Sequence, residues 1–234
     1  MLKYQQIAQL IEQKIIEDNM GQGEKLPSLG HLIDYYQVSK STIVKALSIL
    51  ENRGVIYQIQ GSGIFARKRK KKGYINMLEN QGFTSDLENF NLSSKVVFVK
   101  IIKPTEELIN NLNCSNDDDI YHIKRIRYIN GQILCIEESF YLKNIVNYLN
   151  EDIVEHSIFH YVKDILKLNI GFSDKHFHVE KLSEESAQLL ELKKGDPSLH
   201  IEELFYLTSG QAFDFSKTIY HYEHSQFFLQ SSNF

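Results

Sequence analysis

The feature that most constrains the fold is a series of apolar stripes in the first 66 residues, each with the spacing of one face of a helix. The first stripe lies in residues 4–18, the second follows Ser28 and the third follows Ser39. Serine before such a stripe can cap a helix. Only a few residues around Gln37-Val38 separate the last two stripes, which predicts a helix-turn-helix. The stripe residues are Ile7, Leu10, Ile11, Ile15, Leu29, Leu32, Ile33, Tyr36, Ile43, Ala46, Leu47 and Leu50.

The pattern changes after Arg53-Gly54, a pair that commonly ends a helix. Residues 55–59 and 64–66 are β-prone, and a glycine-rich stretch, residues 60–63, separates them. This arrangement predicts a hairpin with a glycine tip. Three helices and a hairpin together predict a winged helix, a DNA-binding fold whose third helix enters the major groove.

The charge is distributed unevenly along the 234 residues. Residues 1–73 carry 12 Lys and Arg against 6 Asp and Glu, whereas residues 74–234 carry 14 against 24. This asymmetry predicts a nucleic-acid-facing module followed by a module with another role. The residues expected to face double-stranded DNA are Lys40, Ser41, Thr42 and Lys45 from the third helix, and Gln60, Gly61, Ser62 and Gly63 from the hairpin tip.

The first module resembles the GntR family of bacterial regulators across nearly all of residues 4–66. The resemblance implies that the third helix and the wing tip carry the contacts to operator DNA, and it adds Ser39 to the contacting residues. Two positions depart from the family pattern. Ser28-Leu29-Gly30-His31 lacks the usual basic residue after the Pro-Ser pair, and Lys40 stands where arginine is common. The matching residues are Tyr4-Gln5-Gln6-Ile7, Leu26-Pro27-Ser28, Val38-Ser39-Lys40-Ser41-Thr42-Ile43, Ala46-Leu47, Leu50, Gly54 and Gly61-Ser62-Gly63-Ile64-Phe65.

An unbroken basic run, residues 67–72, follows the wing. It can act as a self-repelling linker, and beside a DNA-binding module it can also contact phosphates. We expect a DNA-binding domain at residues 1–68, a basic linker at 69–76 and a second domain at 77–234.

The second domain alternates strand-like and helical segments in two similar halves. Each half is expected to contribute a strand, a helix and a hairpin, and the hairpin turns lie at Asn130-Gly131 and Ser209-Gly210. Two such halves predict one shared antiparallel sheet with helices on one face, and a ligand site between the halves. The segments expected as strands are residues 95–103, 120–129, 132–141, 173–182, 199–208 and 211–222, and those expected as helices are 105–112, 156–168 and 183–192.

This domain resembles the UTRA domain of the HutC branch of the GntR family, which shares a fold with chorismate lyase. The resemblance rests on shorter motifs, among them Arg125-Ile126-Arg127, Glu137-Glu138-Ser139-Phe140 and Gly195-Asp196-Pro197. It implies an effector such as a sugar phosphate or organic acid. The ending Tyr220-His221-Tyr222-Glu223-His224-Ser225 departs from the family. The effector-binding residues implied are Ser94, Arg125, Arg127, Glu137, Ser157, Phe159, Asp214 and Tyr220.

Arg125 and Arg127 lie two apart on a predicted strand and therefore point to the same face. A plain two-residue turn at Asn130-Gly131 would set Glu137 opposite Lys124 and turn it away from them. A three-residue loop with Gly131 in a bulge would set Glu137 opposite Arg125. We expect the bulge, with an Arg125–Glu137 ion pair lining a pocket near Ser157 and Asp214.

Other residue clusters give no further site. Cys114 and Cys135 indicate neither a disulfide framework nor a metal site. His176 and His178, or His221 and His224, could bind a metal, but no matching cysteine or carboxylate set accompanies them, so we expect neither metal nor cofactor. Glu137 and Glu138 have no nucleophile and base around them. No apolar stretch approaches the ~20 residues of a membrane helix.

These observations predict an α+β protein: a winged helix-turn-helix followed by an antiparallel sheet with helices, similar to chorismate lyase. We expect a cytoplasmic, homodimeric, ligand-responsive DNA-binding regulator that acts as a repressor. Two alternatives remain open at this point: an enzyme related to chorismate lyase fused to a DNA-binding head, and a constitutive DNA-binding dimer with no effector.

Overall fold

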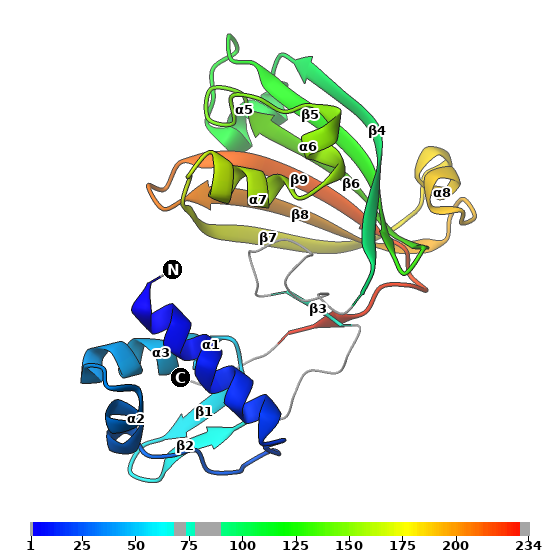
Figure 1. The fold of residues 1–234 in the computed structure, drawn as a ribbon. Coiled ribbons are helices and arrows are strands. Elements are labelled where there is room, and N and C mark those ends of the chain that lie inside the picture. The colour runs from blue at the N-terminus through cyan, green and yellow to red at the C-terminus, as the bar shows by residue number, and fades with distance from the viewer. Residues whose placement is uncertain (1, 68–73, 78–89, 230–234) are drawn as a thin grey trace. The chain divides into compact units, whose positions relative to one another are not determined.

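The computed structural model describes residues 2–67, 74–77 and 90–229 (Figure 1). Its contacts divide the chain into two compact units. The first comprises Met1–Glu79 with Phe228–Phe234, and the second comprises Asn80–Phe227. No helix among the described residues is both long and apolar enough to span a membrane.

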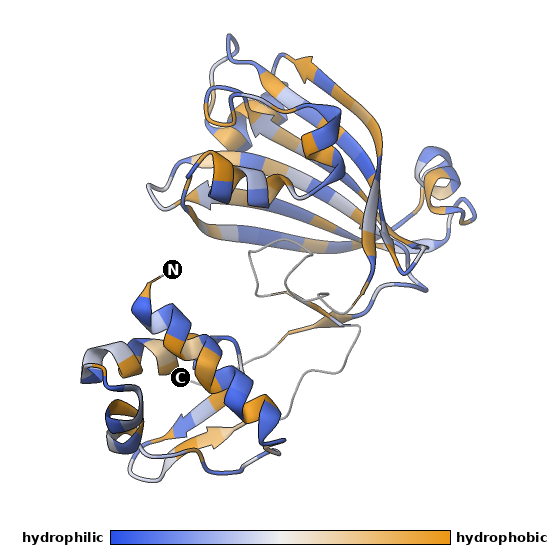
Figure 2. Ribbon diagram, in the orientation of Figure 1, coloured by the Kyte–Doolittle hydropathy of each residue, from blue (hydrophilic) through white to orange (hydrophobic). Residues whose placement is uncertain are grey.

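The first unit contains three helices and a β-hairpin, as the apolar stripes predict. The helices alternate apolar and polar residues along their length (Figure 2), and their apolar faces form one core. Leu10 was expected in that core but is 49% exposed. The elements are α1 (Lys3–Glu17), α2 (Leu29–Tyr36), α3 (Lys40–Asn52), β1 (Ile56–Ile59) and β2 (Gly63–Ala66). The buried core residues are Ile7, Ala8, Ile11, Ile15, Leu26, Leu32, Ile43, Ala46, Leu47, Leu50, Ile56, Ile64 and Ala66.

Both predicted serine caps are present, and they fix where α2 and α3 begin. Ser28 Oγ accepts the backbone N–H of His31, and Ser39 Oγ accepts that of Thr42, each at 3.3 Å. Between the two helices, Gln37 adopts a left-handed conformation with φ 51°. This short turn confirms the helix-turn-helix.

A third segment pairs with the hairpin, and the sequence did not predict this pairing. The backbone N–H of Leu26 donates to Ile64 O at 2.8 Å, and that of Ala66 donates to Glu24 O at 2.8 Å. Lys25 thereby bridges to Phe65 in antiparallel fashion. The segment before α2 therefore extends the sheet of the wing.

The second unit is built on a six-stranded antiparallel sheet with the order β4-β5-β6-β9-β8-β7. The strands β4, β5 and β6 form one half, β7, β8 and β9 form the other, and the halves join between β6 and β9. This confirms the predicted pair of similar halves sharing one sheet. The strands are β4 (Leu92–Ile102), β5 (Ile120–Ile129), β6 (Gln132–Leu142), β7 (Ile170–Lys181), β8 (Pro197–Leu207) and β9 (Ala212–Tyr220).

Helices cover both faces of this sheet, so the expectation of helices on one face only is wrong. Leu108 of α5 packs with Phe140, whereas Ile158 of α7 packs with Tyr141. Phe140 and Tyr141 are neighbours on β6 and point to opposite faces. Figure 1 shows α6 and α7 across the front of the sheet. The helical elements are α5 (Glu106–Leu112), α6 (Glu151–Glu155), α7 (Ile158–His160), the π-helical turn η1 (Tyr161–Ile165) and α8 (Glu184–Leu190).

Other sequence expectations need smaller corrections. The single helix expected at 156–168 is instead α7 followed by η1, because Ser157 caps a new helix start after α6. The strand expected to reach residue 222 ends at Tyr220. Two short strands, β3 (Ile75–Asn76) and β10 (Phe227–Phe228), form a separate two-stranded sheet that the sequence did not predict, and β3 lies in the segment expected as linker. Residues 68–72 of the basic run lie outside the described residues.

Candidate functional site

The first turns of α3 form an exposed, hydrophilic surface. Lys40, Ser41 and Lys45 are exposed, and Thr42 is half-buried. Ser39 Oγ lies 2.9 Å from both Ser41 Oγ and Thr42 Oγ1. The hydroxyls thus gather at the positive end of the helix dipole, where a phosphate is favoured.

The wing tip is a three-residue loop, Gln60 to Ser62, whose members are all exposed. Gly61 has φ 78° and Gly63 has φ 133°, conformations that residues other than glycine rarely adopt. A Cβ at Gly63 would also lie 2.7 Å from Cε of Lys25. Lys25 was not predicted from the sequence, because only the pairing of its segment with β2 brings it to the wing.

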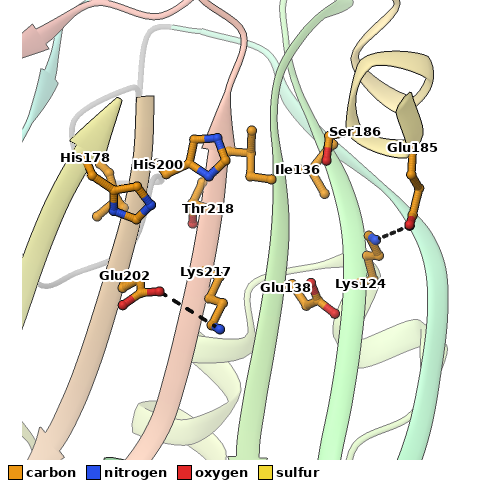
Figure 3. A pocket seen from close by; sticks show the side chains of 12 residues that line it. Lys124, Ile136, Glu138, His178, Glu185, Ser186, His200, Glu202, Lys217 and Thr218 are labelled. Atoms are coloured by element: carbon orange, nitrogen blue, oxygen red, sulfur yellow. Dashed lines mark hydrogen bonds and ion pairs between the residues drawn. The ribbon is translucent and has the colours of Figure 1, made fainter. Parts of the chain in front are cut away.

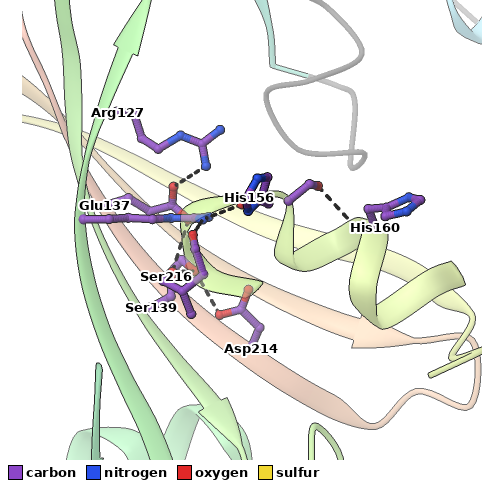
Figure 4. Close-up of polar contacts among 10 residues, drawn as sticks. Arg127, Glu137, Ser139, His156, His160, Asp214 and Ser216 are labelled. Carbon is purple, nitrogen blue, oxygen red and sulfur yellow. Dashed lines mark hydrogen bonds and ion pairs between the residues drawn. The ribbon is translucent and has the colours of Figure 1, made fainter. Parts of the chain in front are cut away.

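Three charged side chains meet inside the second unit. Arg125, Arg127 and Glu137 are 4%, 7% and 8% exposed. Arg125 Nη2 donates to Glu137 Oε1 at 2.8 Å, and Arg127 Nη1 donates to Glu137 Oε2 at 3.4 Å (Figure 4). The Arg125–Glu137 ion pair expected from the sequence is therefore present.

The register expected for this pair is correct, but the mechanism that produces it is not. Arg125 pairs with Glu137, as predicted. Asn130 and Gly131 both have positive φ, 51° and 82°, and form a plain two-residue turn between Ile129 and Gln132. The register shift comes later, where β6 carries Leu134 as an extra residue. Leu134 O then accepts the backbone N–H of His221 at 2.9 Å.

Arg125 also connects the sheet to the helices above it. Its Nη1 donates to Val154 O at 2.6 Å and to His156 O at 3.1 Å, at the end of α6. Its Nε is buried and has no hydrogen-bond partner among the described residues. One guanidinium thus joins the carboxylate of Glu137 to the segment between α6 and α7.

A polar chain extends from Glu137 to Asp214. Ser139 Oγ donates to Glu137 Oε1 at 3.3 Å, and Ser216 Oγ lies 2.9 Å from both Ser139 Oγ and Asp214 Oδ1 (Figure 4). Asp214 is fully buried, and Tyr141, its register partner on β6, also interacts with this carboxyl group. Ser139 and Ser216 were not predicted from the sequence, although each lies two residues from a predicted site residue and shares its face.

The two carboxyl groups respond to burial in opposite ways. Burial alone would raise the pKa of Glu137, but the charges of Arg125 and Arg127 outweigh it and hold this pKa below its usual value. Burial raises the pKa of Asp214 well above its usual value, and the charge of Glu137 adds to the rise. The pair therefore favours an ionised Glu137 beside a protonated Asp214.

The remaining predicted residues lie around this cluster. Ser94 pairs with Arg127 across β4 and β5 and is half-buried. Tyr220 is buried opposite Cys135. Ser157 Oγ accepts the backbone N–H of His160 at 3.2 Å and so caps α7.

Phe159, on α7, packs edge-on against Phe205 at 4.8 Å between ring centroids. A further carboxylate, Glu203, is half-buried and was not predicted. It accepts from Ser173 Oγ at 2.6 Å and lies 3.4 Å from Lys175 Nζ. It pairs with Ser216 in the register of β8 and β9, so it belongs to the same face.

Cys114 and Cys135 are both free.

Comparison with known proteins agrees with both units. Residues 3–66 match the model of bacterial regulatory proteins of the gntR family, and residues 88–226 match the UTRA domain. Over its full length the chain is 57% identical to an uncharacterised HTH-type transcriptional regulator, YydK, of Bacillus subtilis strain 168, and covers 99% of it. It is 28% identical to the HTH-type transcriptional repressor NagR of the same organism, over 93% of this chain and 89% of that one.

Solved structures give the same result. The crystal structure of YydK from Bacillus subtilis superposes with a TM-score of 0.87 at 56% identity, covering 99% of this chain and 100% of that one. A Staphylococcus aureus gene product, SA0254, superposes with a TM-score of 0.65 at 39% identity, covering 68% of this chain and 99% of that one. The chain belongs to the GntR family of bacterial regulatory proteins, and it is a DNA-binding transcriptional regulator with a UTRA domain rather than an enzyme.

Proposed function

We propose that the chain is a repressor that leaves its operator when its second domain binds a small anionic metabolite, a sugar phosphate or an organic acid. In this proposal residues 1–68 bind operator DNA, residues 69–76 are a basic linker and residues 77–234 bind the effector and dimerise. The protein acts in the cytoplasm, where bacterial DNA lies. The observation that carries the proposal is the buried cluster of Arg125, Arg127 and Glu137.

The cluster has more positive than negative charge. Two guanidiniums share the carboxylate of Glu137, while the raised pKa of Asp214 favours its neutral form. Burial and the charge of Arg125 also lower the pKa of Arg127, as expected for a buried cation beside a second cation. A ligand phosphate or carboxylate would add negative charge to this cluster through bidentate hydrogen bonds.

Groups suited to the uncharged part of a ligand lie close by. The carboxyl group of Asp214 and the hydroxyls of Ser139 and Ser216 lie on the same face of the sheet. Such groups suit the hydroxyls of a sugar. We propose Ser94, Ser157, Phe159 and Tyr220 as the further effector-binding residues.

The names of two relatives support a sugar-derived effector and a repressor. The chain is 25% identical to the mannosyl-D-glycerate transport/metabolism system repressor MngR of Escherichia coli, over 97% of this chain and 94% of that one. The effector-binding domain of the Bacillus subtilis trehalose repressor shares the fold, with a TM-score of 0.55 at 23% identity.

Arg125 provides a route from ligand to DNA. An anion that attracts this guanidinium would compete with its bonds to Val154 O and His156 O and release the segment between α6 and α7. A coupling of only ~1–3 kcal/mol between the two sites is enough for regulation.

The predicted homodimer belongs to the same proposal. One winged helix covers too little DNA for typical specific affinity, so two chains should bind a two-fold-related operator with half-sites about one helical turn apart. Sedimentation at micromolar concentration should show a dimer. A monomer both free and on DNA would contradict this part of the proposal.

A thermal-shift screen of phosphorylated sugars and organic acids tests the effector site. At about 100 times its dissociation constant a true effector stabilises the folded chain by about 2.7 kcal/mol. Arg127→Ala keeps the stronger Arg125–Glu137 pair but should lose the shift. Lys124→Ala, on the same strand and the opposite face, is the matched control and should keep it. No shift with any compound, or an equal shift in Arg127→Ala, would contradict the proposal.

A further inference from the structure

The face of the sheet opposite Glu137 holds a polar cavity of about 240 Å³. Glu138, Lys217 and Glu202 face it from three adjacent strands, in register with one another (Figure 3). His178 and His200 line its outer end. The charged residues there are already paired: Lys217 with Glu107 and Glu202, and Glu138 with His122. These ion pairs do not account for the presence of the two histidines.

His178 and His200 stand directly opposite each other on β7 and β8. Their ring centroids are 5.2 Å apart and the rings are inclined by 32° (Figure 3). Glu180 lies two residues beyond His178 on the same face, with Oε1 3.5 Å from His178 Nε2. The three side chains each offer one ligand atom, and these atoms all lie within 4.8 Å of one another.

His200 has the properties of a metal ligand. Its Nε2 is buried and has no hydrogen-bond partner among the described residues. In a tetrahedral zinc site, with bonds of about 2.0–2.2 Å, ligand atoms lie roughly 3.4 Å apart. Small rotations of side chains would bring the three groups to that spacing.

We propose that His178, His200 and Glu180 bind a divalent transition metal ion of the Zn²⁺ class, with the fourth position taken by water or by Glu202. Two imidazoles and a carboxylate are the ligand set that such ions prefer over Mg²⁺ or Ca²⁺. No metal site was expected from the sequence, because neither His176 with His178 nor His221 with His224 has a matching cysteine or carboxylate set that the sequence alone reveals. The pairing of β7 with β8 supplies His200, which lies 22 positions along the chain from His178.

The ligand atoms of a second group, His221, Glu223 and His224, also lie within 4.8 Å of one another, but this group is less suited to a metal. The two rings are stacked at 3.9 Å and inclined by only 11°. The lone pairs of parallel rings lie in parallel planes and do not converge on one ion. His221 Nδ1 is also occupied, because it accepts the backbone N–H of Glu223 at 3.3 Å. We therefore assign the metal to the β7–β8 group.

The test is titration of the chelator-stripped full chain with ZnCl₂ in a calorimeter. The wild type should bind one ion per chain through this site, and His178→Gln and His200→Gln should each weaken that binding at least about tenfold. His176→Gln is the matched control, because His176 lies on the same strand and face but outside the group, and it should bind as the wild type does. Circular dichroism checks that each variant is folded.

Cobalt gives an independent readout. Co²⁺ in the wild type should give the intense visible absorption of tetrahedral coordination, and this band should disappear in His200→Gln. Absence of Zn²⁺ binding in the wild type, or unchanged binding in both His178→Gln and His200→Gln, would overturn the proposal. So would loss of the site in His221→Gln instead. The site is independent of the effector proposed at Arg127, so the two proposals fail separately.

Discussion

At the scale of single residues, Glu137 and Glu138 show how one position along a strand decides the role of a side chain. Glu137 is buried between two arginines, whereas Glu138 faces the other side of the sheet and pairs with His122. The sequence could single out both carboxylates, but only the strand register separates them. Their substitution should therefore have very different costs.

Glu137→Ala should lower the free energy of unfolding of the second unit by about 3–5 kcal/mol, because it leaves two buried guanidiniums without their carboxylate. Glu138→Ala, the matched control, should cost less than about 1 kcal/mol, since its pair is partly exposed. Urea unfolding followed by circular dichroism measures both. Equal costs would contradict the assigned burial of Glu137.

Asp214 gives a prediction with a defined sign. Because its pKa is raised on folding, the folded chain holds this proton more tightly than the unfolded chain. Between the pKa of about 3.9 in the unfolded chain and the higher pKa in the folded chain, Asp214 is ionised in the unfolded chain but protonated in the folded chain. The free energy of unfolding of the wild type therefore falls as the pH rises through this range. Asp214→Asn lacks this effect. The stability of Asp214→Asn relative to the wild type should rise with pH above about 4, by at most about 1.4 kcal/mol per pH unit.

Urea unfolding of both proteins between pH 4 and 8 measures this difference. The opposite contribution of Glu137, whose lowered pKa favours folding above the unfolded value, is common to both proteins and cancels. A difference that is flat or falls with pH would show that Asp214 is ionised in the folded chain.

At the scale of elements, the sequence predicted the features that depend on contacts between residues close together along the chain. Ser28 and Ser39 each cap the helix that follows, as predicted from serine before an apolar stripe. Thr105 and Ser183 cap α5 and α8 in the same way, at the start of two segments predicted as helices. The Asn130-Gly131 turn also lies where expected. These features depend on a few consecutive residues, which is why the sequence reveals them.

Features that depend on distant segments were not predictable. The extra residue at Leu134 is stabilised by the N–H of His221, which lies 87 positions away in the sequence and is not anticipated by any local pattern. Helices cover both faces of the sheet, and the face that each helix covers depends on the path of the segment that connects two strands. The link from Ser139 through Ser216 to Asp214 requires β6 to pair with β9. The candidate site could therefore be predicted as a set of residues but not as a network.

The recognition helix gives a prediction at this scale. Lys40→Ala with Lys45→Ala should weaken operator binding and lower the slope of log affinity against log salt by about one unit for each DNA phosphate that is no longer neutralised. Both lysines are exposed on α3. Lys194→Ala, an exposed lysine of the second unit, should change neither quantity. Fluorescence anisotropy on an operator selected from random duplexes provides the measurement, and an unchanged slope in the double variant would contradict the assignment.

At the scale of the whole molecule, the uneven charge found in the sequence corresponds to two units with different tasks. The first 73 residues carry an excess of positive charge and include the winged helix, while the acidic remainder contains the six-stranded sheet. Within that acidic unit the Arg125–Arg127 cluster is a local exception. An excess of buried positive charge in an otherwise acidic unit is the property that the proposed anionic effector exploits.

The most direct measurement of the central claim is release of the full chain from its selected operator, followed by fluorescence anisotropy while phosphorylated sugars and organic acids are added. The wild type and Arg127→Ala should bind the operator equally well, because Arg127 lies in the second unit. At least one compound should then release the wild type and leave Arg127→Ala bound. Release of both proteins by the same concentration, or of neither by any compound, would contradict the account.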